Sequence, residues 1–153
     1  MKGFYLTQEG KLVVGVAPID IGGVAKVSDY WSMANYQKAS IVVCCGVITN
    51  AAQITVFESQ DNAGTGEAAI GFSYYALDGA GDIGARTTVA AAGFSTGTTN
   101  NRAWIIELDA SELSDGSPYM TVKTDGAAAN IITILPILEG ARYAQANPPE
   151  ALT

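Results

Sequence analysis

Hydrophobic and polar residues alternate over several short segments in the middle of the chain. In the segment 53–57, Ile54 and Val56 fall on one face of an extended strand, and Thr55 falls on the other. Similar alternation recurs in the segments 69–77, 102–110 and 119–124. Ile70, Phe72 and Tyr74 share one face of the segment 69–77, and the residues predicted to face inward in the last two segments are Trp104, Ile106, Leu108, Met120 and Val122. A period of two predicts strands that bury one face.

Two further segments are apolar without alternation. Residues 40–48 form a continuous run rich in β-branched side chains, which predicts a strand buried on both faces. Residues 131–138 form the last predicted strand. Pro136 lies near its end and predicts a sheet edge or a bulge, because proline has no backbone N–H.

Turn-forming residues separate these segments. The segment 61–66 is rich in Asp, Asn and Gly, so the runs 53–57 and 69–77 on either side of it predict a β-hairpin. Similar turn-forming segments recur along the chain as far as residue 126. A single helical turn is predicted at 110–113. The pattern predicts about seven or eight strands and no long helix. The predicted fold is therefore all-β, an antiparallel β-sandwich of jelly-roll-like type.

The two ends of the chain differ from this domain. Residues 1–27 combine apolar residues with a proline and paired glycines, which predicts an extended N-terminal arm lying on its own domain or on a neighbouring subunit. Residues 28–140 form the predicted β-sandwich domain, and residues 141–153 an irregular tail. Residues 28–39 fit either a capped helical turn or a strand, with Trp31 and Tyr36 as packing anchors.

The net charge of the chain limits the kinds of partner that it is expected to bind. The 153 residues include 15 acidic and 8 basic side chains, a net charge of −7, and the basic residues are scattered singly. Phosphate binding needs several convergent cations, so we expect no nucleic-acid partner and no anionic membrane partner. Only 15% of the residues are charged, which suggests a surface covered by neighbouring subunits.

The composition lacks residues that several kinds of catalytic and metal-binding chemistry require. The chain has no histidine, which removes the commonest general base and metal ligand. The two cysteines, Cys44 and Cys45, are adjacent and would point to opposite faces of a strand, so we expect reduced thiols and folding in a reducing cytoplasm. No apolar region of a signal peptide follows Lys2, and the apolar run 131–138 is too short to span a bilayer.

The candidate sites each have a simpler structural explanation. Asp78 and Asp82 fit a calcium loop or, more simply, a turn. The acidic residues between 109 and 125 show no spacing typical of a glycosidase, and the glycine pairs at 64–66 and 79–81 lack the lysine of a phosphate-binding loop. We therefore predict no enzyme activity, no catalytic residue, no cofactor and no metal.

Aromatic residues offer three alternatives. They can pack in the core, lie at a subunit interface or form a ligand platform, and core packing is the preferred interpretation. The adjacent Tyr74 and Tyr75 must place one ring on each face of their strand. One of those rings is then either exposed or covered by another subunit.

The order of the segments resembles that of a known family. A short apolar arm is followed by an aromatic segment and by the runs YQKASIVVCCGVI (36–48), ITVFESQDNAGT (54–65), WIIELDASEL (104–113) and YMTVK (119–123). Over about residues 28–140, this order and composition resemble the capsid decoration (cement) proteins of tailed bacteriophages. The resemblance implies a jelly-roll-like sandwich that assembles as a homotrimer on the exterior of the head, bound to the major capsid protein, with no catalytic residue.

The sequence therefore predicts a structural virion protein made in the host cytoplasm. An apolar arm gains stability only when another surface buries it, at about 1.5–3 kcal/mol for each large side chain. The predicted interface residues are Phe4, Tyr5, Leu6, Leu12, Val13, Val14, Trp31 and Tyr75. The alternatives are another virion component, such as a tail or baseplate protein, and a carbohydrate-binding module.

Overall fold

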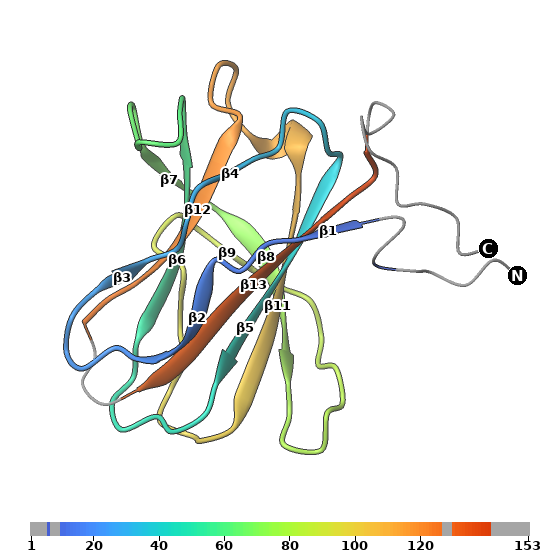
Figure 1. The fold of residues 1–153 in the computed structure, drawn as a ribbon. Helices are drawn as coiled ribbons and strands as arrows, with labels where there is room; N and C mark the ends of the chain where they lie inside the picture. Colours follow the sequence, from blue (N-terminus) through green and yellow to red (C-terminus); the bar gives the residue numbers. More distant parts are fainter. Residues whose placement is uncertain (1–5, 7–9, 127–129, 142–153) are drawn as a thin grey trace, which may run out of the picture.

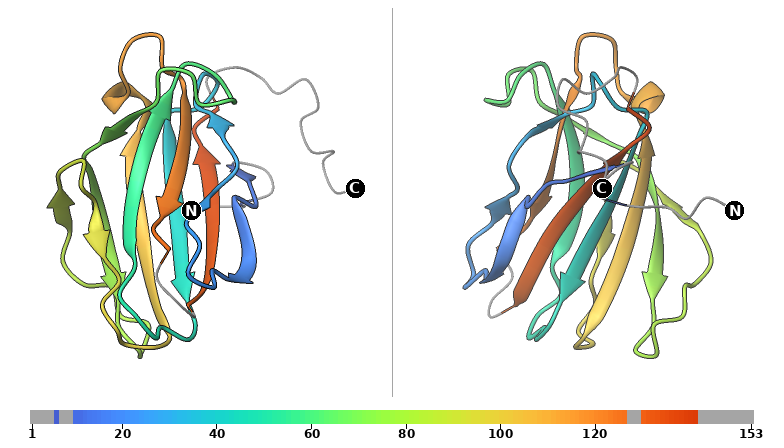
Figure 2. Two further views of the ribbon diagram at one scale, coloured as in Figure 1. Left: turned by 90° about the vertical axis from the view of Figure 1, so that its left-hand side faces the viewer. Right: turned by 45° about the vertical axis from the view of Figure 1, so that its right-hand side comes forward.

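The computed structural model of the chain describes residue 6 and residues 10–126 and 130–141. These residues form two antiparallel sheets packed face to face (Figure 1). The left view of Figure 2 shows the sheet with β6 and β12 in front of the sheet with β5, β11 and β13. The predicted antiparallel β-sandwich is confirmed.

The larger sheet has seven strands. Its order is β1, β13, β5, β11, β8 and β9, and β2 also pairs with β13. The strands are β1 (Gly10–Leu12), β2 (Val16–Asp20), β5 (Lys38–Cys45), β8 (Phe72–Leu77), β9 (Thr87–Val89), β11 (Arg102–Asp109) and β13 (Ile131–Glu139).

The smaller sheet has six strands. Its order is β10, β6, β12 and β3, with β7 paired to β6 and β4 to β12. The strands are β3 (Lys26–Val27), β4 (Trp31–Ser32), β6 (Gln53–Ser59), β7 (Ala68–Ile70), β10 (Phe94–Ser95) and β12 (Tyr119–Thr124). The predicted helical turn is present as the 3₁₀ helix η1 (Ala110–Glu112).

The core lies between the sheets and combines inward residues of the alternating segments with the buried faces of β5 and β13. Trp104, Ile106 and Leu108 of β11 are buried, as the pattern predicted. Phe94 joins the sheets through its ring, which stacks on Tyr74 at 4.3 Å between centroids and contacts Trp104 at 5.5 Å. Aromatic rings packed in this way bury large apolar areas and hold the two layers in register.

One predicted strand is divided in two. The residues 69–77 contribute β7 to the smaller sheet and β8 to the larger one, so only β7 forms the predicted hairpin with β6. Gly71 lies between them, and a Cβ there would come within 2.9 Å of the Val89 carbonyl oxygen. The chain can therefore pass from one sheet to the other close to a neighbouring backbone only because this residue has no side chain.

Much of the predicted N-terminal arm belongs to the sandwich. Residues 10–12 and 16–20 pair with β13, and residues 26–27 pair with β12. Of the two alternatives that the sequence left open, these segments lie on their own domain. The free edge of β13 supplies the backbone hydrogen bonds that hold them there.

Pro136 does not lie on an edge strand, because β13 has β1 and β2 on one side and β5 on the other. On the side of β1 and β2, the pairing with β13 is interrupted. It stops at Leu12, which lies opposite Ile137, and resumes at Val16, which lies opposite Ile134. Pro136 faces this interruption, and a Cβ on Gly15 would lie 3.2 Å from its Cδ. The irregularity expected of a proline is thus accommodated by the neighbouring strand.

Within the segment 28–39, the strand alternative holds only for the two residues of β4 and the first two of β5, and a turn lies between them in which Tyr36 N donates to the Met33 carbonyl oxygen at 3.0 Å. The burial of Thr121 corrects one prediction. The alternation in 119–124 places Thr121 opposite the buried face of Met120 and Val122 and so predicts a solvent-facing side chain, but Thr121 is fully buried, and its Oγ1 donates to the Ser28 carbonyl oxygen at 2.9 Å. The predicted tail lies outside the described residues except for its first residue.

Candidate functional site

The outer face of the seven-stranded sheet carries a set of apolar side chains that no described layer covers. The right view of Figure 2 shows β13, β5, β11 and β8 side by side, with no helix or third sheet of the described chain packed over them. We define the outer apolar surface as Leu12, Val42, Cys44, Tyr75, Leu77, Ala103, Ile105, Leu135 and Ile137. It is the candidate functional site.

The strand register aligns these side chains into rows. Leu135 lies opposite Val42, Val42 opposite Ile105, and Ile105 opposite Tyr75, so one row crosses four strands. Side chains directly opposite one another on the same face of a sheet lie in contact distance. All four are half-buried, because they shield one another while their tips face outward.

The flanking rows extend the apolar surface. On one side Cys44 and Leu77 both lie opposite Ala103. On the other side Ile137 lies opposite Leu12, which is 51% exposed at the edge of the sheet. A contiguous apolar sheet face of this kind is a candidate interaction site.

Charged side chains border the apolar surface at one end. Lys38 Nζ donates to Glu107 Oε1 at 3.0 Å, and Glu139 and Asp109 lie opposite Lys38 on the neighbouring strands. The hydrogen bond to Glu107 raises the pKa of Lys38, so the ammonium stays charged. An apolar centre with a charged border is the usual arrangement of a protein–protein interface.

The two cysteines lie on opposite faces of β5, as their adjacency predicted. Cys45 faces the core, and burial raises its pKa to about 12. Cys44 belongs to the outer apolar surface, and burial also raises the pKa of its thiol. Both thiols are protonated at neutral pH and behave as small apolar groups.

The predicted interface residues have different locations. Phe4 and Tyr5 lie outside the described residues, and Leu6 is half-buried. Leu12 and Tyr75 belong to the outer apolar surface, whereas Val14 is 55% exposed elsewhere and Val13 packs against the core.

Trp31 corrects the interface prediction. Its side chain is only 4% exposed, so it is a packing anchor of the core and presents little surface to a neighbour. The cause is its position on β4, where Trp31 pairs with Met120 of β12 and turns toward the space between the sheets. The indole therefore acts as the core aromatic that one of the sequence alternatives predicted.

The sequence analysis missed most of the outer apolar surface. Val42, Ile105, Leu135 and Ile137 were not among the predicted interface residues, although they form its centre. A signal was present in the run 40–48, which predicted a strand buried on both faces. The described chain buries one face of β5 fully and leaves the other half-exposed, and that difference locates the surface.

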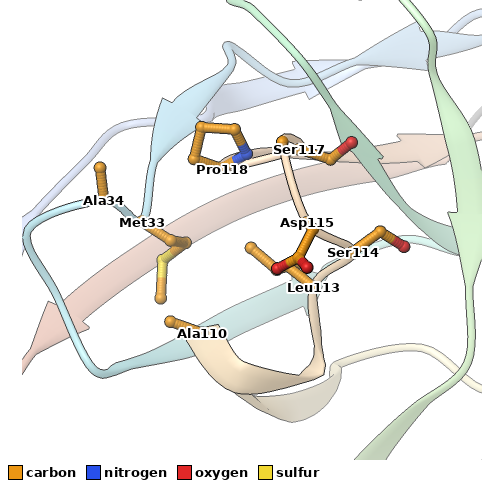
Figure 3. Close-up of a pocket in the computed structure, with 9 residues that line it drawn as sticks. Met33, Ala34, Ala110, Leu113, Ser114, Asp115, Ser117 and Pro118 are labelled. Atoms are coloured by element: carbon orange, nitrogen blue, oxygen red, sulfur yellow. The ribbon is translucent and has the colours of Figure 1, made fainter.

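A small cavity lies near the 3₁₀ helix (Figure 3). It has a volume of about 240 Å³ and is lined by Met33, Ala34, Ala110, Leu113, Ser114, Asp115, Gly116, Ser117 and Pro118. The buried Glu58 carboxylate accepts a hydrogen bond from Ser114 N at 2.8 Å and fastens the loop that forms one wall. Asp115 is the only charged residue of the lining, so the cavity holds no pair of acid and base groups.

The candidate calcium loop is a turn in the structure. Asp78 Oδ1 accepts hydrogen bonds from the backbone N–H groups of Ala80 and Asp82, each at 2.9 Å. The carboxylate thus stabilises the loop itself, in the manner of an Asx turn. No group of three or more potential metal-ligating side chains is found within residues 10–126 and 130–141.

Two of the carboxylates between 109 and 125 have local partners. Glu112 Oε2 accepts a hydrogen bond from Asp109 N at 2.7 Å, as in a capping box at the start of the 3₁₀ helix. Asp125 Oδ1 accepts one from Gln53 N at 3.0 Å and ties β12 to the start of β6. These contacts give both groups a structural role.

One polar cluster lies on the smaller sheet. Tyr30 Oη donates to Glu67 Oε1 at 2.8 Å, and Lys123 Nζ pairs with Glu67 Oε2 while lying 4.2 Å from the centre of the Phe57 ring. Burial and the hydrogen bond to Glu67 raise the pKa of Tyr30 to about 12. The cluster joins the segment before β4 to the loop before β7.

Within the described part of the chain, no helix has the length and the apolar character that crossing a membrane requires.

Comparison with known proteins shows a structural similarity. No protein-family model matches the chain, and no curated protein matches it in sequence. The backbone is similar to the crystal structure of the SPBc2 prophage-derived protein YomS, with a TM-score of 0.48 and 8% sequence identity. The alignment covers 86% of this chain and 94% of that one. Neither the function nor the assembly of this chain follows from that similarity.

Proposed function

We propose that this protein is a structural virion protein that decorates and stabilises the exterior of a bacteriophage capsid, without catalysis. It assembles as a homotrimer and binds the major capsid protein. The observation that supports this proposal is the outer apolar surface, which one copy of the described chain leaves without a packed partner. The resemblance of the segments 36–48, 54–65, 104–113 and 119–123 to decoration proteins supplies the class of assembly.

Energetics favour coverage of this surface by another chain. Burying a fully exposed large side chain stabilises an assembly by about 1.5–3 kcal/mol, and the half-buried side chains of this surface gain part of that amount. Ile105, Leu135 and Tyr75 lie in one row, so a single flat partner surface can cover them together. Only part of this gain appears as affinity, because association also costs rotational and translational freedom.

We assign the outer apolar surface to contacts between copies of this chain. Leu12, at the edge of the sheet, continues the surface to the side of the domain where β1 runs. In a ring of three copies each surface contacts a different patch on the next copy, and the ring closes. Several contacts in a closed ring act together, so moderate individual affinities suffice for a stable assembly.

The experiment that tests the proposed location is antibody labelling of purified phage particles from the source strain. Gold-labelled antibody against the full-length protein is applied to intact particles, and its position is scored by electron microscopy. We expect label on the outside of the head. Label confined to the tail would instead support a tail or baseplate component, and particles without this protein by mass spectrometry would contradict a role in the virion.

A further inference from the structure

The loop between β8 and β9 presents an apolar and a basic side chain together. Ile83 is 63% exposed, and Arg86, three residues further on, is also exposed. The Arg86 guanidinium forms no hydrogen bond or ion pair with any other described residue. A guanidinium can donate two parallel hydrogen bonds to a carboxylate, so this loop carries an unused recognition group for an acidic partner. We call Ile83 and Arg86 the loop patch.

The loop patch adjoins the outer apolar surface. Ile83 forms an isolated antiparallel bridge with Leu77, which lies opposite Ala103 within that surface. Residues paired in this way place their side chains on the same side of a sheet. The apolar surface therefore continues to Ile83 at the edge of the larger sheet beyond β8, while β1 lies at the opposite edge in the right view of Figure 2.

The opposite edge carries a complementary set of side chains. Leu12 of β1 is 51% exposed and lies opposite Ile137 of β13. Glu139 follows Ile137 by two residues and so lies on the same face, about 7 Å further along the strand. Its partner on β1 is Gly10, which has no side chain to cover it. We call Leu12, Ile137 and Glu139 the β13 patch.

The charged border next to the β13 patch has more carboxylates than cations. Lys38 lies between Glu139 and Asp109 on the neighbouring strands, and its Nζ donates to Glu107 at 3.0 Å. Three carboxylates thus share one ammonium group. A copy that covers this border takes the carboxylates out of water, which is costly unless the covering copy supplies a cation. The border therefore favours a partner surface with a basic side chain beside an apolar one.

The two patches also match in spacing. Three residues of extended chain place Ile83 and Arg86 at most about 10 Å apart, and the long arginine side chain adapts to the 7 Å step on β13. We propose that in the assembly the loop patch of one copy lies on the β13 patch of the next. Ile83 then packs against Leu12 and Ile137. Arg86 pairs with Glu139.

This contact rests on the proposed assembly of copies and names the two surfaces that meet in it. The loop patch and the β13 patch lie at opposite edges of one sheet, so the contact joins different surfaces of neighbouring copies. A contact of this head-to-tail kind forms a ring when the rotation between copies closes.

The first test is a disulfide between copies. Arg86→Cys and Glu139→Cys are combined in a Cys44→Ser background, and the protein is oxidised. Within one copy Arg86 precedes β9, which is four strands from β13, about 19 Å, whereas the Cα atoms of a disulfide lie within about 7 Å. A disulfide between the two sites therefore joins two copies, and we expect linked dimers and trimers in a non-reducing gel. Lys26→Cys/Glu139→Cys, with its first site on β3 of the smaller sheet, is the matched control and should remain a single chain.

The second test reverses the charges. Arg86→Glu should raise the dissociation constant of the assembly about tenfold, because it sets two carboxylates against each other in the interface. The exchange Arg86→Glu/Glu139→Arg should restore assembly. Lys26→Glu makes the same change of charge outside both patches and should leave the dissociation constant unchanged. Sedimentation of the full-length variants measures all three.

The outcomes separate this contact from the assembly itself. An unmodified trimer whose paired cysteines at positions 86 and 139 remain unlinked would overturn the contact and leave the assembly in place. Equal effects of Arg86→Glu and Lys26→Glu would also overturn it. An unmodified protein that sediments as a monomer would contradict the proposed assembly, and this contact with it.

Discussion

Ile105 of β11 lies directly opposite Val42 of β5, and both side chains point away from the core of the sandwich. The residues next to them, Ile106 and Ile41, are also paired and are fully buried on the other face. One pair of aliphatic residues thus lies on the outer face of the sheet, and the neighbouring pair lies in the core. Since both faces of these strands are apolar, the central strands have the composition of a layer with packing on both sides.

The first prediction compares adjacent isoleucines on β11. Ile106→Ala should lower the free energy of unfolding by about 2–5 kcal/mol, because it removes a fully buried side chain and leaves a cavity. Ile105→Ala should cost less than about 1.5 kcal/mol in the isolated chain, because its side chain is only partly buried. Urea unfolding at low protein concentration measures both. Equal losses would show that the outer face is packed within one copy.

The second prediction concerns thiol reactivity. In a separated subunit iodoacetamide should modify Cys44 slowly, because its pKa is raised, and should leave Cys45, with a pKa of about 12, unmodified in the folded protein. In the assembled protein Cys44 should be protected as well. Mass spectrometry of the alkylated protein at pH 8 gives the extent of reaction, and Cys44→Ser is the control. Rapid alkylation of Cys44 in the assembly would show that its part of the outer apolar surface is open.

The third prediction concerns pH. The pKa of Tyr30 is raised to about 12 in the folded protein by burial and by its hydrogen bond to Glu67. The protonated phenol is therefore favoured by folding, and its contribution to stability is complete below pH 10 and is lost as the pH rises toward 12. Absorbance at 295 nm should show one tyrosine that ionises late, and Tyr30→Phe should remove that component. Loss of the late component with another tyrosine variant instead would contradict this assignment.

The fourth prediction compares two glycines that both have a left-handed backbone conformation, with a positive φ. Gly93 has φ +74°, and a Cβ there would lie 1.9 Å from the Ile54 carbonyl oxygen. Gly97 has φ +65° with no atom within 4 Å of such a Cβ. Both alanine substitutions should lose about 1–2 kcal/mol to the left-handed backbone, and Gly93→Ala should lose about 1–3 kcal/mol more through the clash. Similar thermal unfolding midpoints for the two variants would contradict this difference.

Periodicity was a reliable guide to the faces of strands and a poor guide to sheet membership. Trp104, Ile106, Met120 and Val122 are buried as predicted, because alternation reflects a local geometry that every extended strand shares. The division at Gly71 and the burial of Thr121 depend on contacts with Val89 and Ser28, which are distant in sequence. No local pattern contains those contacts.

The candidate site was predictable only in part. Tyr75 was identified because it directly follows Tyr74 in the sequence, and Leu12 because it belongs to the predicted apolar arm. Ile105 and Leu135 were missed because their neighbours, Trp104 and Ile134, supply the core, and the sequence does not show whether another layer covers the second apolar face of a strand. The register across four strands, which turns separate residues into a surface, is a property of the fold.

The central claim is that another copy of the chain covers the outer apolar surface. The most direct measurement is the mass of the full-length protein in solution, by sedimentation equilibrium, for Ile105→Lys and for the matched control Val24→Lys, which lies 61% exposed in the turn between β2 and β3. We predict a trimer for the unmodified protein and for Val24→Lys, and a folded monomer for Ile105→Lys. A monomeric unmodified protein, or a folded Ile105→Lys variant that remains a trimer, would contradict the claim.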